Sequence, residues 1–208
     1  IRRLQVVVLS PQALINAWYI PNPPWKQWRR QENNDGIFLE SYRELQAACT
    51  KILQFRMQLL PYLYAAFFRY HLEGLPPFRA LVMDYPDDPN VYTIDDEWMI
   101  GDRILAAPLS AGESGRSVYL PQGTWFDFWT GKPVEGGRSL EIQASLDHIP
   151  LFVRGNAVLP LAQITLNTAD PASITWKCAF MGMAACPARC LRMMAPAWIT
   201  PGAHSTAW

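Results

Sequence analysis

The chain has no excess of charge of either sign, since 18 Lys and Arg balance 18 Asp and Glu over 208 residues. It therefore lacks the basic surface that nucleic acids or anionic lipids select, and we expect no nucleic-acid partner. It also lacks an apolar run near the roughly 18 residues that a membrane helix needs, so we expect no membrane partner. The brief apolar run after Arg3 has no cleavage site of the kind that ends a signal peptide. Because the chain begins with Ile1, we expect that an upstream part is missing.

Cysteine and histidine are scarce, with four Cys and three His. Cys49 lies within a helical pattern, and no second CxxC or His pair accompanies the cluster formed by Cys178, Cys186 and Cys190. Such a cluster is a poor zinc site, and a disulfide scaffold is uncommon in so apolar a chain. We therefore expect reduced thiols in a cytoplasmic protein, with no metal and no cofactor. Nothing in the sequence predicts an oligomeric state.

Hydrophobic residues make up half of the chain and include nine Trp, which predicts a packed core. The stretch 15–28, "INAWYIPNPPWKQW", is aromatic and rich in Pro, so it predicts a loop. Residues 40–74 predict a helix, because apolar residues recur there at spacings of three and four. Pro61 predicts a kink or two abutting helices, and Gly74 predicts the helix end.

Short strands are expected after this helix. Residues 78–85, "FRALVMDY", predict a strand, whereas 95–102, "DDEWMIGD", predict one or two helical turns with Thr93 or Asp95 as N-cap. "RILAAPLS" predicts the next strand. From Arg116 the apolar pattern alternates, which predicts further strands at "RSVYLPQG", "TWFDFWTG", "RSLEIQA" and "IPLFVRGNAVLPL".

The acidic stretch "DYPDDP" at 84–89 raises the question of a calcium site. It has no EF-hand spacing, and Asp-Pro pairs initiate turns. We interpret Asp84, Asp87, Asp88, Asp95 and Asp96 as turn and cap residues, with Asp95 or Asp96 paired with Arg79 or Arg103.

The order of the motifs resembles glycoside hydrolase family 31, which contains α-glucosidases and α-xylosidases. The residues that carry the resemblance lie between Asn16 and Leu161: "LLPYLYAAF", "PPFRALVMDYPDD", "DDEWMIGDRILAAPL", "VYLPQGTWFDFWTG" and "IPLFVRGNAVLPLA". The resemblance implies an α+β chain: the last elements of a (β/α)8 barrel, followed by a small, incomplete antiparallel β-sandwich. It divides the chain into a barrel end (1–77), a connecting strand and short-helix subdomain (78–110), a proximal β-sandwich domain (111–172) and a tail (173–208).

The resemblance also implies a retaining hydrolysis of an α-glucoside or α-xyloside, in which one carboxylate attacks the anomeric carbon and a second protonates the leaving oxygen. In the family both Asp lie on earlier barrel strands, so no catalytic residue is assigned here and the chain alone is expected to be inactive. The partner implied for the full-length enzyme is an oligosaccharide or glycoside substrate.

The candidate substrate-binding residues are Asn16 and Trp18, in the loop before the helix, where barrel enzymes gather their active-site loops. An Asn can hydrogen-bond sugar hydroxyls and a Trp can stack on a sugar ring. The alternative is that both fill the space between barrel and β domain. The family's Arg-x-His-Gly segment has no His at the matching "INAWYIPNPPW".

A second hypothesis is a carbohydrate-binding or scaffolding β-sandwich module. It depends on an exposed, coplanar pair formed by Trp125 and Trp129, which alternation along "TWFDFWTG" places on one strand face. Burial of both faces of that strand is the competing interpretation. His71 and His148 have no partner motif and are interpreted as structural or exposed.

The tail has a different composition. No acidic residue follows Asp170, yet the tail contains three of the four Cys and four of the seven Met. Moving the reading frame by one base forces Glu from Trp-Lys, Gly from Met-Gly and Met-Ala, and Asp from Met-Met, and gives a strand-turn-strand pattern similar to the family's. We interpret the tail as frame-shifted or disordered, with the slip near 172–174, and expect an uncovered sheet edge beside it. The first nine residues are a weaker case of the same kind.

Overall fold

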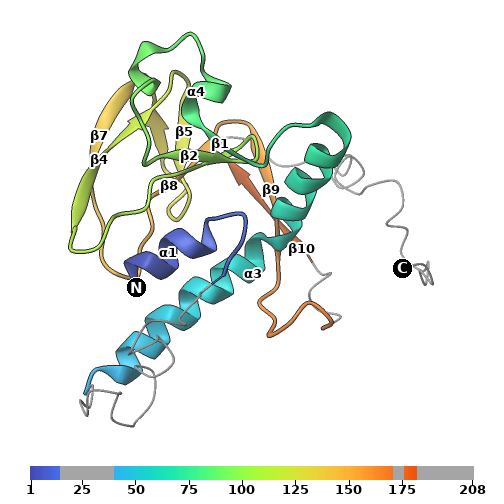
Figure 1. The fold of residues 1–208 in the computed structure, drawn as a ribbon. Helices are drawn as coiled ribbons and strands as arrows, with labels where there is room; N and C mark the ends of the chain where they lie inside the picture. Colours follow the sequence, from blue (N-terminus) through green and yellow to red (C-terminus); the bar gives the residue numbers. More distant parts are fainter. Residues whose placement is uncertain (15–39, 171–175, 182–208) are drawn as a thin grey trace.

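The computed structural model describes residues 1–14, 40–170 and 176–181. At its centre lies an antiparallel sheet of six strands in the order β1-β2-β3-β8-β5-β6. These strands are β1 (Phe78–Ala80), β2 (Trp98–Ile100), β3 (Ile104–Ala106), β8 (Leu151–Arg154), β5 (Thr124–Asp127) and β6 (Pro133–Glu135). Two helices, α1 (Arg2–Val8) and α3 (Tyr42–Glu73), accompany the sheet, and a ribbon of β4 (Gly115–Leu120) and β7 (Arg138–Gln143) lies apart from them (Figure 1).

The side chains of the sheet separate into two cores by alternation along the strands. Ile104 of β3 packs in a cluster with α1 and α3, whereas its neighbour Leu105 packs in a second cluster with the β4–β7 ribbon. On β8, Val153 and Phe152 divide in the same way. The sheet is thus the middle layer between the helices and the ribbon. Burial on both faces explains why its inner strands read as continuous apolar runs.

Pro61 was predicted to cause either a kink or two abutting helices; helix α3 runs unbroken through it, so the second alternative is wrong. Pro61 removes one hydrogen bond, but Leu59 and Tyr62 on either side of it are buried in the core shared with the sheet. Packing therefore holds the helix together across the proline. Gly74 ends the helix as predicted, with φ of 72° and its amide donating to the Tyr70 carbonyl at 2.9 Å.

Two predicted elements differ in the structure. The predicted strand 78–85 stops at Ala80 and continues as the helical turn α4 (Leu81–Asp84), because only Leu81 of its apolar residues is buried while Val82 and Met83 are exposed. The predicted helical turns at 95–102 are wrong. That segment forms strand β2, in which Met99 faces the ribbon core and Ile100 the helix core.

The other predicted strands are present. The last of them is divided into β8 and β9 (Ala157–Ala162) by a turn at Asn156, which has φ of 57°. Strand β6 was not predicted.

Strands from the predicted connecting segment 78–110 and from the predicted domain 111–172 share the central sheet. Fold and sequence agree on a mixed α and antiparallel β chain.

At the C-terminal side, β10 (Trp176–Met181) pairs antiparallel with β9 from Trp176↔Ala162 to Met181↔Ala157. The sheet edge that we expected to be uncovered is therefore paired along β9. The rest of the tail, 182–208, lies outside the described residues.

The first nine residues are integrated into the fold. Leu4, Val8 and Leu9 are buried in the helix-side core. The guanidinium of Arg2 donates to the carbonyls of Ala144 at 2.7 Å and Ser145 at 3.1 Å, which ties α1 to the loop after β7. These contacts give no support to the idea that this segment is misread.

Candidate functional site: the pocket beside Glu97 and Arg116

The predicted substrate residues Asn16 and Trp18 lie outside the described residues, as does the rest of the loop 15–39. Their role stays a prediction. Within the described residues the candidate site is a different one. One side of it is formed by residues 90–97, which follow the acidic stretch 84–89.

The acidic stretch forms turns and caps, as predicted. Asp88 caps the short 3-10 helix η1 (Pro89–Val91), and its Oδ1 accepts the Asn90 amide at 3.0 Å. The Tyr119 hydroxyl donates to Asp88 Oδ2 at 2.7 Å, and this bond is the main cause that lowers the pKa of Asp88. Within the described residues, no group of three His, Cys, Asp or Glu could hold a metal ion.

The predicted ion pairs are wrong. Arg79 pairs with Asp84 at 2.9 Å and with Asp102 at 3.3 Å, because it is buried beside α4 and the β2–β3 turn. Asp96 instead pairs with Arg116 of β4 at 2.7 Å. Since β2 replaces the predicted helix, neither Thr93 nor Asp95 is an N-cap.

The exposed tryptophan pair on which the second hypothesis depends is absent, and Trp125 follows the competing interpretation of burial. Trp125 is 1% exposed in the ribbon-side core, and its Nε1 donates to the Pro121 carbonyl at 2.7 Å. Trp129, 40% exposed, lies beyond the end of β5 and packs beside Phe55 of α3, with ring centroids 5.1 Å apart. Because Trp125 is buried and Trp129 lies apart from it against α3, the two rings form no exposed pair, which removes the main support for a binding module built on them. His148 contacts Trp129, and His71 is exposed.

A surface pocket of about 560 Å³ lies between the segment that follows the acidic stretch and the β4–β7 ribbon; we call it the Glu97 pocket. One wall is formed by 90–97. Alternation forms the other wall: Val118 and Leu120 are buried, so Ser117 and Tyr119 face outward. The complete lining is Asn90, Thr93, Ile94, Asp95, Asp96, Glu97, Arg116, Ser117, Tyr119, Gly137, Arg138 and Ser139.

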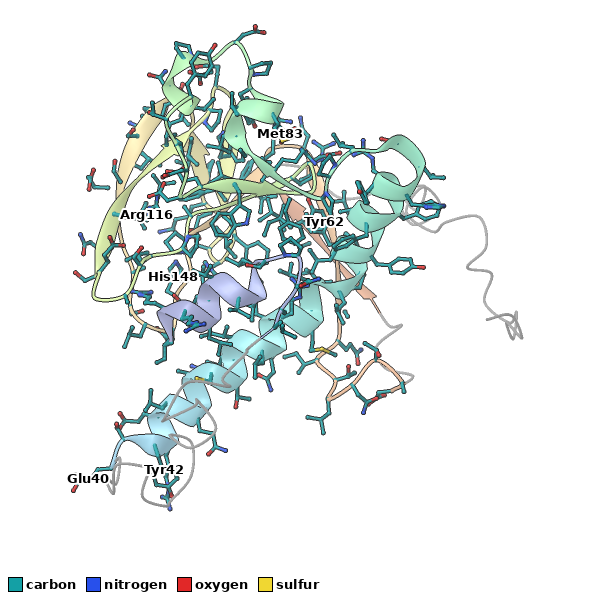
Figure 2. The ribbon with its side chains drawn as sticks, in the orientation of Figure 1. Glu40, Tyr42, Tyr62, Met83, Arg116 and His148 are labelled. Carbon is teal, nitrogen blue, oxygen red and sulfur yellow. The ribbon has the colours of Figure 1, made fainter. Side chains whose placement is uncertain are left out.

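Arg116 fixes the two walls to each other. Its Nη1 donates to the carbonyls of Pro108 at 2.8 Å and Asp96 at 3.1 Å, while Nη2 pairs with the Asp96 carboxylate. Its side chain is mostly buried. Figure 2 shows Arg116 on the ribbon side of the molecule, away from Tyr62 of α3. Five directed donors on a planar group make arginine suited to holding such a junction rigid.

Glu97 is the most unusual side chain of the pocket, because it is a carboxylate only 4% exposed. Its Oε1 accepts hydrogen bonds from the Tyr119 backbone amide at 3.0 Å and from Arg116 Nη2 at 3.4 Å. The carboxyl group thus gives β4 the acceptor that the carbonyl of a neighbouring strand would otherwise provide. Its Oε2 is buried without a partner among the described residues. Burial raises the pKa of Glu97 to about 7, against the opposing effects of the Tyr119 amide and of Arg116.

Sequence reasoning missed Glu97 and Arg116. Glu97 follows two exposed aspartates and looks like a third surface acid. The signal that could have found it is alternation, since Glu97 and Met99 are two positions apart and both lie on the buried ribbon side.

Comparison with known proteins decides the family. Residues 74–159, from the end of α3 into β9, match the sequence profile described as "Glycosyl hydrolase family 31 C-terminal domain". The chain belongs to glycoside hydrolase family 31. It is 36% identical to an α-xylosidase of Saccharolobus solfataricus over 172 residues, an alignment that covers 82% of this chain and 22% of that enzyme. It is 37% identical over 145 residues to α-glucosidase 2 of Bacillus thermoamyloliquefaciens, covering 69% of the chain and 18% of the relative.

The fold agrees with that assignment. A family 31 α-xylosidase from Xanthomonas citri superimposes with a TM-score of 0.70 at 28% identity, over 82% of this chain and 18% of that one. The chain thus spans about a fifth of the length of these three relatives. The Glu97 pocket lies within the matched range 74–159.

Proposed function

We propose that the chain is part of a retaining α-glycosidase that hydrolyses α-glucosides or α-xylosides, and that it supplies the last barrel helix and the proximal β domain. The similarity to an α-xylosidase and an α-glucosidase supports the substrate class. The catalytic carboxylates belong to barrel strands outside this chain, so the chain alone does not turn over substrate. Asn16 and Trp18 are the proposed sugar contacts.

The observation that carries the barrel assignment is a second apolar stripe on α3. Leu53, Tyr64 and Phe67 are 42%, 55% and 39% exposed, and they share one helix face with the half-buried Met57 and Leu60. Their spacing of four, three, four and three residues keeps them in line along the helix.

The stripe lies about 110° around the helix from the buried positions Ile52 and Leu59, as the 100° turn per residue requires. Helix α3 therefore has two apolar faces: the central sheet covers one, and within the described residues it reaches the second only at its end, through the ring contact of Phe67 with Phe78. A helix between a barrel and its β domain needs two such faces, because each layer must bury one.

The first test is an assay of the purified chain with aryl α-xyloside and aryl α-glucoside. We expect no turnover above a blank. Saturable hydrolysis would overturn the proposal that the catalytic pair lies outside the chain.

The second test asks whether the chain can complete an active enzyme. In the α-xylosidase of Saccharolobus solfataricus, the matching segment is replaced by residues 15–170 of this chain. We expect an active chimera, and we expect Tyr64→Asp to abolish its assembly by placing a charge on the stripe. The matched control is Ala65→Asp, one position along on an exposed face outside the stripe. Equal effects of the two substitutions would contradict a buried stripe.

The same chimera tests the loop. Asn16→Ala and Trp18→Ala are each expected to raise KM for the aryl α-xyloside, because they remove a hydroxyl contact and a stacking surface. Loss of thermal stability with unchanged KM would instead indicate that both residues fill the space between the barrel and the β domain.

A further inference from the structure

The geometry points to a binding site for a neutral saccharide in the Glu97 pocket, between the turn 90–97 and the β4–β7 ribbon. This site is independent of the proposed hydrolytic activity, because it uses only groups of this chain. Its volume, about 560 Å³, falls in the range of small-molecule sites.

The pocket is rigidly built before any ligand enters. Arg116 holds its two walls together through bonds to Pro108, Asp96 and Glu97, and these bonds occupy its donors. The Tyr119 hydroxyl donates to Asp88, and the side-chain amide of Asn90 donates to that hydroxyl at 3.2 Å. A preorganised site pays little ordering cost on binding.

The lining offers both acceptors and donors that are not used within the described residues. The Asp95 carboxylate makes no hydrogen bond to another described residue, and it is exposed. Across the pocket, Arg138 uses only Nε, in a long contact to the Glu135 carbonyl, so its terminal nitrogens face no described acceptor. The side-chain hydroxyls of Thr93, Ser117 and Ser139 make no hydrogen bond within the described part of the chain. Sugar hydroxyls both donate and accept, so they suit such a mixed set.

Glu97 provides an independent indication. It lines the pocket, it is buried, and its Oε2 receives no hydrogen bond from any described residue. Buried carboxyl oxygens are nearly always paired, so an unpaired one beside a pocket calls for a hydrogen-bond partner, and a sugar hydroxyl can pair with either the ionised or the protonated form.

The charge of the lining favours a neutral ligand over a strongly charged one. Asp95, Asp96 and Glu97 oppose Arg116 and Arg138, and Asp96 and Glu97 already share Arg116. An anion would face the unpaired Asp95, and a dication lacks a set of three ligands within the described residues. The side of the Tyr119 ring and Ile94 add apolar surface for the C–H face of a pyranose.

The test is a titration of the whole chain with isomaltose, followed by the amide resonances of Tyr119 and Ser139. We expect saturable shifts confined to the pocket. Asp95→Ala and Arg138→Ala, both at exposed side chains, are each expected to weaken binding by roughly tenfold, the equivalent of one lost charged contact. The matched controls are Asp87→Ala and Lys132→Ala, which are exposed residues outside the lining and should leave the affinity unchanged.

Parallel titrations with methylammonium chloride and with glycerol define the ligand class. Tighter binding of methylammonium would overturn the saccharide assignment in favour of a cation site. Equal weak binding of glycerol and isomaltose, or the absence of saturation by isomaltose, would overturn the proposal entirely. Loss of hydrolysis in the family 31 chimera, with these shifts retained, would contradict the proposed function and leave this site standing.

Discussion

The hydroxyl of Tyr62 lies where the side chain of any residue but glycine would be at position 101. A Cβ built on Gly101 would be 2.5 Å from Tyr62 Oη, and Gly101 has φ of 56°. From this position the hydroxyl donates to the Ile100 carbonyl at 2.7 Å and accepts the Arg103 amide at 3.0 Å. Helix α3 thus completes the hydrogen bonding of the β2–β3 turn.

Replacement of Gly101 is therefore expected to destabilise the fold. Gly101→Ala adds both the contact with Tyr62 and a left-handed backbone that costs about 1–2 kcal/mol for an L-residue. Gly131→Ala is the control, because Gly131 has a similar φ of 66° and no atom within contact distance. Urea unfolding should show the larger loss for Gly101→Ala, and equal losses would mean that the close approach carries no cost.

Removal of the hydroxyl alone tests the turn from the other side. Tyr62→Phe leaves the Ile100 carbonyl and the Arg103 amide without their partner, which is expected to cost roughly 1–3 kcal/mol of unfolding free energy. Tyr70→Phe, at an exposed position on the same helix, is expected to change little. A Tyr62→Phe variant as stable as the wild type would show that the turn does not need this contact.

The stability of the chain should depend on pH through Glu97. Its folded-state pKa, raised from 4.5 to about 7 by burial, means that the native state holds this proton more tightly than the unfolded chain. The contribution is therefore fully present below about pH 4.5 and is lost as pH rises towards 7, at about 1.4 kcal/mol per pKa unit.

Glu97→Gln should abolish that loss, so the variant gains on the wild type by up to roughly 3 kcal/mol between acidic and neutral pH. Urea unfolding at several pH values measures this difference. Glu141→Gln, an exposed acid on the neighbouring strand β7, is the control. An unchanged pH slope in Glu97→Gln would contradict a raised pKa.

Arg2 is expected to be a stability determinant although it lies one residue from the start of the chain. Its guanidinium donates to the carbonyls of Glu113, Ala144, Ser145 and His148. Arg2→Ala removes these four hydrogen bonds, of which the one to Ala144 is buried, and should lower the free energy of unfolding by roughly 1–3 kcal/mol. Arg3→Ala, at an exposed neighbour, should be neutral in the same measurement; comparable losses would exclude a specific role for Arg2.

The two faces of α3 should respond differently in this chain. Leu59→Ala removes a side chain buried in the core and is expected to cost about 2–5 kcal/mol. Leu53→Ala, on the exposed stripe, is expected to stay within about 0.5 kcal/mol of the wild type. Thermal unfolding distinguishes the two, and a large loss for Leu53→Ala would mean that the stripe already packs within this chain.

Sequence patterns predicted the elements in which one signal dominates. The long helix up to Gly74 and the alternating strands β4, β5 and β7 have a clear period, and the structure contains them. The segment 95–102 was misassigned because Asp95 at its start looked like the N-cap of a helix, whereas burial of Met99 and Ile100 on opposite sides requires a strand. Tertiary packing, which no local pattern contains, decided the outcome.

The candidate site was less predictable for the same reason. Arg116 pairs with Asp96 and Glu97, which lie about twenty positions earlier in the chain. Sequence spacing alone favoured Arg79 or Arg103 as the partner of Asp96. Family resemblance located the pocket's motif, "DDEWMIGD", without revealing that its glutamate turns inward.

The order of the central sheet has a consequence for biosynthesis. Strand β3 pairs with β2, its neighbour in the chain, but its other partner is β8, in the register Ile104↔Val153. The whole β4–β7 segment must therefore leave the ribosome before the middle of the sheet can close, and such distant pairings are slow to form. Until then, the side chains of Ile104 and Leu105, which point to opposite faces of the sheet, are both exposed to water. The nascent chain at this stage is the form most in need of a chaperone.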